Sequence, residues 1–224
     1  MDAVIKVGGS LAEDHARLKA LCTTLSALAE NYELMVVPGG GKFADVVRDL
    51  DQRFNLSSVV SHRMAILGMD QFGLLLSDFV PNSHVIRQLE AAKAATEAKN
   101  VPIFLPSQLM FQDDPLENSW DVTSDSIAAY IAWRLHAGKL VLVTDVDGVF
   151  TLDPKKNKDA VLIKQMSAKE LLNLNKRTSV DRGLAKMLLD AQLDCYVVNG
   201  RFPERVAAVL AGQSVTCTFV LART

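Results

Sequence analysis

Short apolar runs alternate with longer amphipathic segments along most of the chain. The apolar runs are typical of short buried strands and occupy residues 4–7, 33–37, 85–86, 101–105, 139–144, 195–198 and 215–221. Between them, apolar positions recur at helical spacing in residues 11–30, 43–50, 57–76, 88–99, 127–135, 187–191 and 204–210. Strands that alternate with helices predict a mainly parallel sheet with helices on both faces. We therefore expect an α/β fold, a three-layer αβα sandwich.

A lysine interrupts the first apolar run. Gly8 and Gly9 follow Lys6 where the predicted strand must end, and Ser10 stands three residues before Glu13, which is the spacing of a capping box. Glycines let backbone N–H groups approach an anion, and a helix start adds partial positive charge. Lys6 has two interpretations: an exposed side chain on an edge strand, or a lysine that faces phosphate oxygens at the carboxyl end of the strand.

A second glycine turn follows the second apolar run. Gly39, Gly40 and Gly41 stand just before a predicted helix, which is again a geometry that suits an anion. A Walker A loop is excluded, because positions 36 and 43 are Val and Phe instead of the Gly and the Ser or Thr that the motif requires. A dinucleotide-binding pattern matches only weakly, because residues 57–76 read as a helix where that pattern needs a strand ending in an acidic residue.

Polar residues also precede two later elements. Asp121, Thr123 and Ser124 are each candidate caps of the helix at 127–135, and Asp125 would fall in its first turn, where the helix dipole favours a carboxylate. Capping alone could explain that cluster. The acidic and glycine residues at 145–148 follow a strongly apolar strand, which places them either at the ligand edge of the sheet or in a polar turn. Residues 106–120 read as a loop, and 167–170 form a second capping box.

Composition narrows the possible functions. The chain has 224 residues with a net charge of -2, so we expect one domain that binds neither nucleic acid nor an anionic membrane. The three cysteines match no metal-ligand spacing and are expected to be reduced and buried. No apolar run is long enough to span a membrane, and no secretory signal opens the sequence. These features predict a cytoplasmic protein.

Five stretches taken together resemble the amino acid kinase superfamily over essentially the whole chain. They are K-x-G-G-S at 6–10, P-G-G-G at 38–41, D-V-T-S-D-S-I-A-A at 121–129, T-D-V-D-G-V-F-T-L-D-P at 144–154, and a late glycine followed by Lys186. Each stretch alone is weak evidence for the resemblance, but all five in the family's order are strong evidence. The resemblance implies transfer of the ATP γ-phosphoryl group to a small molecule with Mg²⁺. It also implies an N-terminal acceptor lobe at about 1–136 and a C-terminal nucleotide lobe at about 137–224.

The resemblance also implies roles for single residues. Lys6 and Lys186 match two phosphate-neutralising lysines, and Asp125 matches the carboxylate that positions them. The expected phosphate-binding residues are Gly8, Gly9, Ser10, Gly39, Gly40 and Gly41. The expected nucleotide-binding residues are Thr144, Asp145, Phe150, Asp153 and Lys155. No residue is expected to be a dedicated metal ligand. Many members carry Gly-Gly-Met before the late lysine, where this chain has Arg-Gly-Leu at 182–184.

The acceptor is the least constrained part of the prediction. The stretch 120–126 and the short chain look most like the methanofuran-pathway branch, whose members phosphorylate [5-(aminomethyl)furan-3-yl]methyl phosphate. Arg63 or the second glycine turn would meet the phosphate of such an acceptor, Trp120 its ring and Asp121 its amine, with Thr123 beside them.

Two alternatives remain open at this point: a glutamate- or aspartate-type carboxylate kinase, and a non-catalytic binding or storage protein of the same fold. Intact Lys6 and Asp125 argue against the second alternative. The apolar positions of 57–76 fit either the core or a contact between subunits, and we expect a homo-oligomer.

Overall fold

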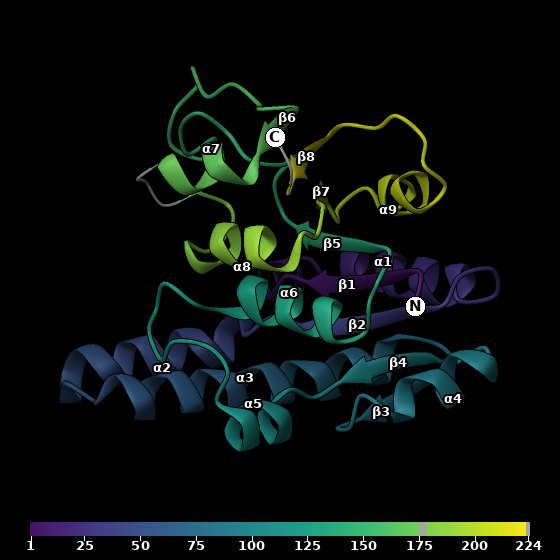
Figure 1. Ribbon diagram of the computed structural model, residues 1–224, viewed down its shortest axis with the longest axis horizontal. Coiled ribbons are helices and arrows are strands. Elements are labelled where there is room, and N and C mark those ends of the chain that lie inside the picture. Colours follow the sequence, from purple (N-terminus) through teal and green to yellow (C-terminus); the bar gives the residue numbers. More distant parts are fainter. Residues whose placement is uncertain (175–177, 223–224) are drawn as a thin grey trace.

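The computed structural model describes residues 1–174 and 178–222. Its strands form one sheet in the order β3-β4-β2-β1-β5-β7-β8-β6, which runs through the middle of the molecule in Figure 1. The strands are β1 (Ala3–Val7), β2 (Leu34–Pro38), β3 (Ser83–Ile86), β4 (Val101–Phe104), β5 (Lys139–Thr144), β6 (Gln165–Ser167), β7 (Cys195–Asn199) and β8 (Cys217–Leu221). All neighbouring pairs are parallel except β7 and β8.

Helices cover both faces of this sheet. They are α1 (His15–Leu28), α2 (Gly41–Phe54), α3 (Ser58–Phe79), α4 (Ala91–Glu97), α5 (Ser107–Asp113), α6 (Ser124–Arg134), α7 (Ala168–Asn173), α8 (Gly183–Ala191) and α9 (Pro203–Leu210), with a short 3-10 turn η1 (Gly9–Glu13) after β1. Val4 belongs to a core shared with α6 and α8, whereas Ile5 belongs to a second core shared with α1 and α9. The alternation of side chains along the strands therefore builds the three αβα layers that the sequence predicts.

Most predicted elements are present with shifted ends, and three differ in kind. The Ser10 capping box is wrong, because η1 has no side-chain cap and α1 starts later, where Asp14 accepts a hydrogen bond from the Arg17 N–H. Residues 106–120 contain α5, a single short helix of which only Met110 is buried, too little to give a periodic signal. The three-residue strand β6 also escapes the pattern. The capping box of Ser167 is confirmed.

The position of β1 determines where the site lies. β1 pairs with β2 on one side and with β5 on the other, so the edge-strand interpretation of Lys6 is wrong. Val7 is opposite Pro38 in one pair and opposite Val143 in the other. Because all three strands are parallel, their carboxyl ends meet at one edge of the sheet, where ligands bind in such folds.

The fold also bears on the predictions for the cysteines and for membrane spans. The three cysteines are free thiols, two of them buried. Within the two described ranges, none of the helices combines the length and the apolar character that a bilayer crossing requires. One sheet continues through both predicted lobes, so the boundary near residue 136 stays a prediction.

Candidate active site

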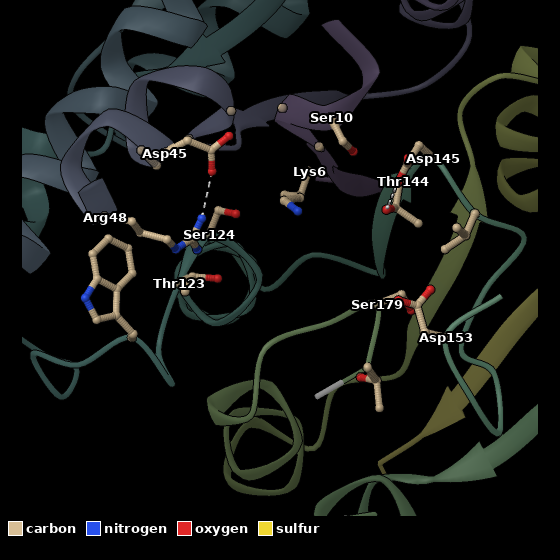
Figure 2. A pocket seen from close by; sticks show the side chains of 18 of the residues that line it. Lys6, Ser10, Asp45, Arg48, Thr123, Ser124, Thr144, Asp145, Asp153 and Ser179 are labelled. Atoms are coloured by element: carbon tan, nitrogen blue, oxygen red, sulfur yellow. Dashed lines mark hydrogen bonds and ion pairs between the residues drawn. The ribbon is translucent and has the colours of Figure 1, made fainter. Parts of the chain in front are cut away.

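A cleft of about 770 Å³ opens at the carboxyl ends of β1, β2 and β5. Its volume lies in the usual range for small-molecule sites. Figure 2 shows Lys6 near its middle, with Asp45 and Arg48 on one side and Asp145 and Asp153 on the other. The sequence-predicted residues that line it are Lys6, Gly8, Gly9, Ser10, Gly40, Gly41, Trp120, Thr123, Thr144, Asp145, Phe150, Asp153 and Lys155.

The two glycine turns form one structure instead of two separate ones. A Cβ atom on Gly9 would lie 2.1 Å from the Cα of Gly41, so no side chain fits between the turns. The Gly39 N–H donates to the Val7 carbonyl at 2.8 Å, which ties the end of β2 to the end of β1. Gly41 has φ of +51°, a conformation that favours glycine. The two strand ends therefore lie together at the floor of the cleft.

Lys6 forms a buried ion pair beneath this floor. Its Nζ lies 2.8 Å from Oδ1 of Asp125, which stands in the first turn of α6. Lys6 is 9% exposed and Asp125 is 6% exposed. A buried ammonium ion is costly unless it is paired, and Asp125 provides that partner while leaving Lys6 in the cleft lining.

A second carboxylate, that of the partly buried Asp181, stands beside this pair. Its backbone N–H donates to Oδ2 of Asp125 at 3.0 Å. Its own carboxylate accepts hydrogen bonds from Thr123, Ser126 and Leu184. Burial and the negative charge of Asp125 raise the pKa of Asp181, and the hydrogen bonds from Ser126 and Thr123 oppose that rise. Sequence reasoning missed this residue, because it is far from Asp125 along the chain.

The other wall of the cleft carries charged residues from the segment after β5. Asp145 is paired with the ammonium of Lys155, and Arg201 lies 3.7 Å from the same carboxylate oxygen. Burial raises the pKa of Asp145, but the hydrogen bond and charge of Lys155, together with hydrogen bonds of Ser10 and the backbone, leave that pKa below its usual value. Asp153 accepts a hydrogen bond from the Lys155 N–H at 2.9 Å. Positive side chains and backbone donors at this wall suit the phosphates of a nucleotide.

An aromatic and charged cluster forms the wall beside α2. The guanidinium of Arg48 stacks over the ring of Trp120 at 4.7 Å and donates to Asp45 at 3.0 Å. The Trp120 indole N–H donates to Asp51 at 2.7 Å, which fixes the ring. Asp45, Arg48 and Trp120 all line the cleft. Asp45 and Arg48 lie three residues apart on the helix that begins at Gly41, a spacing that puts both on one face.

His62, at the start of α3, also lines the cleft. Burial lowers its pKa, while a hydrogen bond with the backbone of Ser119 and the charge of Asp114 act in the opposite direction. The imidazole is therefore neutral at neutral pH.

Five predicted site residues lie outside the cleft lining: Gly39, Arg63, Asp121, Asp125 and Lys186. Gly39 and Asp125 support the lining from behind, as described above. Arg63 is exposed and stacks on Phe111, and Asp121 is exposed and faces Arg182 at 3.7 Å.

Lys186 lies on α8 with an exposed side chain, so the structure does not bring the second predicted lysine into the cleft. Close packing explains why Gly183, the late glycine of the motif, has no side chain. A Cβ atom on Gly183 would lie 2.7 Å from the Ser126 hydroxyl, so the start of α8 packs closely against the start of α6.

No group of three or more His, Cys, Asp or Glu side chains in the described part of the chain is arranged to hold a metal ion. The donor set at the cleft fits Mg²⁺ that is held largely by substrate phosphates and water, as is usual for this ion. That no residue is a dedicated metal ligand stays a prediction.

Comparison with known proteins gives consistent matches. The sequence profile of the amino acid kinase family matches residues 1–199. A [5-(aminomethyl)furan-3-yl]methyl phosphate kinase of Methanocaldococcus jannaschii is 35% identical over 94% of this chain and 93% of its own. A uridylate kinase of Methanococcus aeolicus is 32% identical over 81% of this chain and 80% of its own.

The fold has solved relatives as well. The crystal structure of a uridylate kinase from Archaeoglobus fulgidus superposes with a TM-score of 0.77 at 23% identity, covering 98% of this chain and 100% of that one. A UMP kinase from Ureaplasma parvum gives a TM-score of 0.76 at 19% identity, with 99% and 98% covered. These likenesses confirm the α/β fold.

Proposed function

This chain belongs to the amino acid kinase family, and from that premise we propose that it transfers the γ-phosphoryl group of ATP to a small phosphomonoester, [5-(aminomethyl)furan-3-yl]methyl phosphate. The product would be the corresponding diphosphate. The finding that favours this acceptor among phosphomonoesters is the 35% identity with the kinase from Methanocaldococcus jannaschii, which extends over nearly the full length of both chains.

The cleft floor supports phosphoryl transfer. This reaction needs positioning and charge stabilisation more than covalent chemistry. Lys6 would neutralise the transferred group, and the N–H groups of the joined glycine turns would hold its oxygens. Asp125 would orient Lys6. Because Lys6 already occupies its position in the buried pair, little reorganisation is needed when the reaction begins.

The nucleotide would occupy the wall formed by Thr144, Asp145, Phe150, Asp153 and Lys155. Lys155 lines the cleft with its charge shared between Asp145 and the solvent, so it could turn to the ATP phosphates. Mg²⁺ bound to those phosphates would supply further positive charge at the transferred group. Mg²⁺ prefers oxygen ligands, and the carboxylates of this wall provide such oxygens.

One wall of the cleft also supports the acceptor assignment, because a cation, an anion and an aromatic ring meet there in Arg48, Asp45 and Trp120. The proposed acceptor offers the complement of each, namely a phosphate, an ammonium group and a furan ring. A ligand with both charges can replace the internal Arg48–Asp45 contact without leaving either group unpaired. In this proposal Arg48 and Asp45 would be the partners of the phosphate and the amine, in place of Arg63 and Asp121, which lie outside the cleft lining.

Uridine monophosphate is a second candidate acceptor, because several relatives are uridylate kinases. It is also a phosphomonoester with a flat ring, but it has no ammonium group. Asp45 would then have to accept hydrogen bonds from hydroxyl groups in place of a cation. The two candidate acceptors therefore differ in the group that would contact Asp45, an ammonium group in one and hydroxyl groups in the other.

A panel assay of ATP consumption tests the proposal. The panel holds [5-(aminomethyl)furan-3-yl]methyl phosphate, uridine monophosphate, glutamate and aspartate, with hydroxylamine added to trap acyl phosphates. We expect turnover of the furan phosphate to a stable diphosphate and no hydroxamate. Preferred turnover of uridine monophosphate would replace the acceptor. A hydroxamate from an amino acid would establish the carboxylate kinase, and no turnover of any acceptor by protein that binds ATP would favour the non-catalytic alternative.

A further inference from the structure

The two oxygens of the Asp125 carboxylate have different partners. Oδ1 lies 2.8 Å from the Nζ of Lys6, and Oδ2 accepts the backbone N–H of Asp181 at 3.0 Å. A carboxylate held at both oxygens has a fixed plane. The direction of the Lys6 ammonium group therefore depends on where the main chain at residue 181 is held.

The Asp181 side chain holds that main chain in place. Its Oδ2 accepts from the Thr123 N–H at 2.8 Å, the Thr123 hydroxyl at 2.9 Å and the Ser126 N–H at 3.0 Å. Its Oδ1 accepts from the Ser126 hydroxyl and from the Leu184 N–H at 2.9 Å. These N–H groups lie at the starts of α6 and α8, where backbone donors lack a partner within their own helix. One carboxylate thus ties both helix starts together.

We propose that Asp181 is a positioning residue for phosphoryl transfer, which fixes the Asp125 carboxylate and, through it, the Lys6 ammonium group at the junction of the glycine turns. The inference rests on the phosphoryl-transfer part of the proposed function and is independent of the acceptor.

A neutral side chain cannot replace this carboxylate. Asp181 accepts from five donors, and asparagine has one oxygen that accepts and an NH₂ group that donates. In Asp181→Asn the NH₂ group would face backbone N–H groups on one side, leaving buried donors unpaired. The same position is costly for a charge, since burial and the neighbouring Asp125 raise the pKa of Asp181.

The segment that carries Asp181 also reaches the nucleotide wall. Thr178 and Ser179 line the cleft, and the Ser179 hydroxyl donates to the Gly148 carbonyl at 2.9 Å. Gly183 lets the other end of the segment approach Ser126 closely. One short stretch therefore connects the proposed ATP site to the pair that positions Lys6, so a shift at Asp181 would move Lys6 relative to the bound nucleotide.

The first test compares Asp181→Asn with a matched control, Asp70→Asn. Asp70 is a half-buried carboxylate that accepts from the Ser107 N–H at 3.2 Å and from the Ser107 hydroxyl, and it ties α3 to α5 outside the cleft lining. We expect Asp181→Asn to lower kcat about 10- to 100-fold, by analogy with the loss of residues that orient metal ligands. The KM for ATP should change much less, and Asp70→Asn should keep the wild-type kcat.

A double-mutant cycle separates positioning from a general loss of folded protein. If Asp181 acts through Lys6, Asp181→Asn lowers kcat strongly in the wild type and hardly at all in a Lys6→Ala background. If it only supports the fold, the two effects multiply. Multiplied effects, or an unchanged kcat in Asp181→Asn, would overturn the proposal.

The last measurement needs no acceptor. The rate at which an amine-reactive reagent modifies Lys6 in the folded protein is followed by mass spectrometry for the wild type and both Asp→Asn variants. We expect a faster reaction at Lys6 in Asp181→Asn only, because Asp125 then holds Lys6 less firmly. An unchanged labelling rate at Lys6 in Asp181→Asn overturns the proposal, whichever acceptor the protein uses. An increased labelling rate together with no turnover in the acceptor panel contradicts only the acceptor assignment.

Discussion

At the scale of single residues, a substitution of Asp45 is the most direct test of the acceptor assignment. Its carboxylate pairs with Arg48 in the cleft wall and is our candidate for the acceptor ammonium group. Asp45→Asn keeps the size of the side chain and removes the charge. We expect kcat/KM for the aminomethylfuran phosphate to fall about 10- to 100-fold, which corresponds to the 1.5–3 kcal/mol of a hydrogen bond to a charged group.

The control for this prediction is the substrate analogue in which a methyl group replaces the aminomethyl group. Its kcat/KM should be low with the wild type and should change little in Asp45→Asn. An equal loss for both acceptors would show that Asp45 supports Arg48 without contacting the amine.

His62 makes stability depend on pH. Burial lowers its pKa below the ordinary value of 6.5, so the unfolded chain takes up a proton before the folded protein does. The contribution of the neutral, buried His62 to stability is therefore fully present above pH 6.5 and falls as the pH drops from that value to the lowered folded-state pKa. Urea unfolding of the wild type and of His62→Gln, at about pH 7.5 and about pH 5, measures this effect. The wild type should lose more stability than the variant, and parallel losses would contradict the burial of the imidazole.

At the scale of elements, the contact between the ends of β1 and β2 is the most sensitive feature. Gly9→Ala would place a methyl group 2.1 Å from the Cα of Gly41, so the two turns must separate. We expect a cost of about 1–3 kcal/mol in stability, as for other overpacked positions, and a fall in kcat of at least about tenfold through the lost donors.

Thermal unfolding and turnover of Gly9→Ala are compared with those of Gly212→Ala. Gly212 has φ of +70°, but a Cβ atom added there would meet nothing within 4 Å, so that variant carries backbone strain without a clash. It should lose about 1 kcal/mol in stability and keep wild-type turnover. Wild-type turnover of a folded Gly9→Ala protein would remove the joined turns from the mechanism.

Some of these elements and site residues can be predicted from the sequence, and others cannot. Apolar runs and glycines identify the strands, the two turns and the place of Lys6, because these signals are local. That the turns touch follows only from the parallel pairing of β1 with β2. Asp181 and Arg48 carry no local signal, since their meaning comes from partners on other elements. Lys186 is the opposite case, since a motif match predicts it as a site residue while its exposed side chain on α8 lies outside the cleft lining, so its role stays a prediction.

At the scale of the whole molecule, we propose that a face of α3 with two exposed leucines contacts a second copy of this chain. Leu67 is 46% exposed and Leu74 is 50% exposed, and Arg63 and Asp78 lie on the same face of the helix. If two such helices cross antiparallel about a midpoint between residues 70 and 71, Leu67 of one meets Leu74 of the other, and Arg63 meets Asp78. Apolar and charged positions then complement each other, which supports the homo-oligomer that we expect.

Light scattering after size-exclusion chromatography tests this arrangement. The wild type should be a dimer, and Leu67→Lys should be a monomer. The double variant Leu67→Lys with Leu74→Glu should restore the dimer, because each new ammonium group would then face a new carboxylate. Leu172→Lys, at a residue with a similarly exposed side chain on α7, is the control and should remain a dimer. A monomeric wild type, or no rescue by the second substitution, would contradict the antiparallel contact.

The central place of β1 has a consequence for how the protein comes to be folded. β1 is synthesised before β5, its neighbour on one side, and Asp125, which pairs with Lys6, lies on α6, the helix that precedes β5 in the chain. During synthesis one side of β1 therefore stays unpaired until Lys139–Thr144 has been made. Pairing between segments so distant in sequence is slow to form and leaves unpaired strand edges open to aggregation. Nascent chains that end before β5 lack one of the three strand ends around the cleft, so the site cannot assemble until this distant strand has been made.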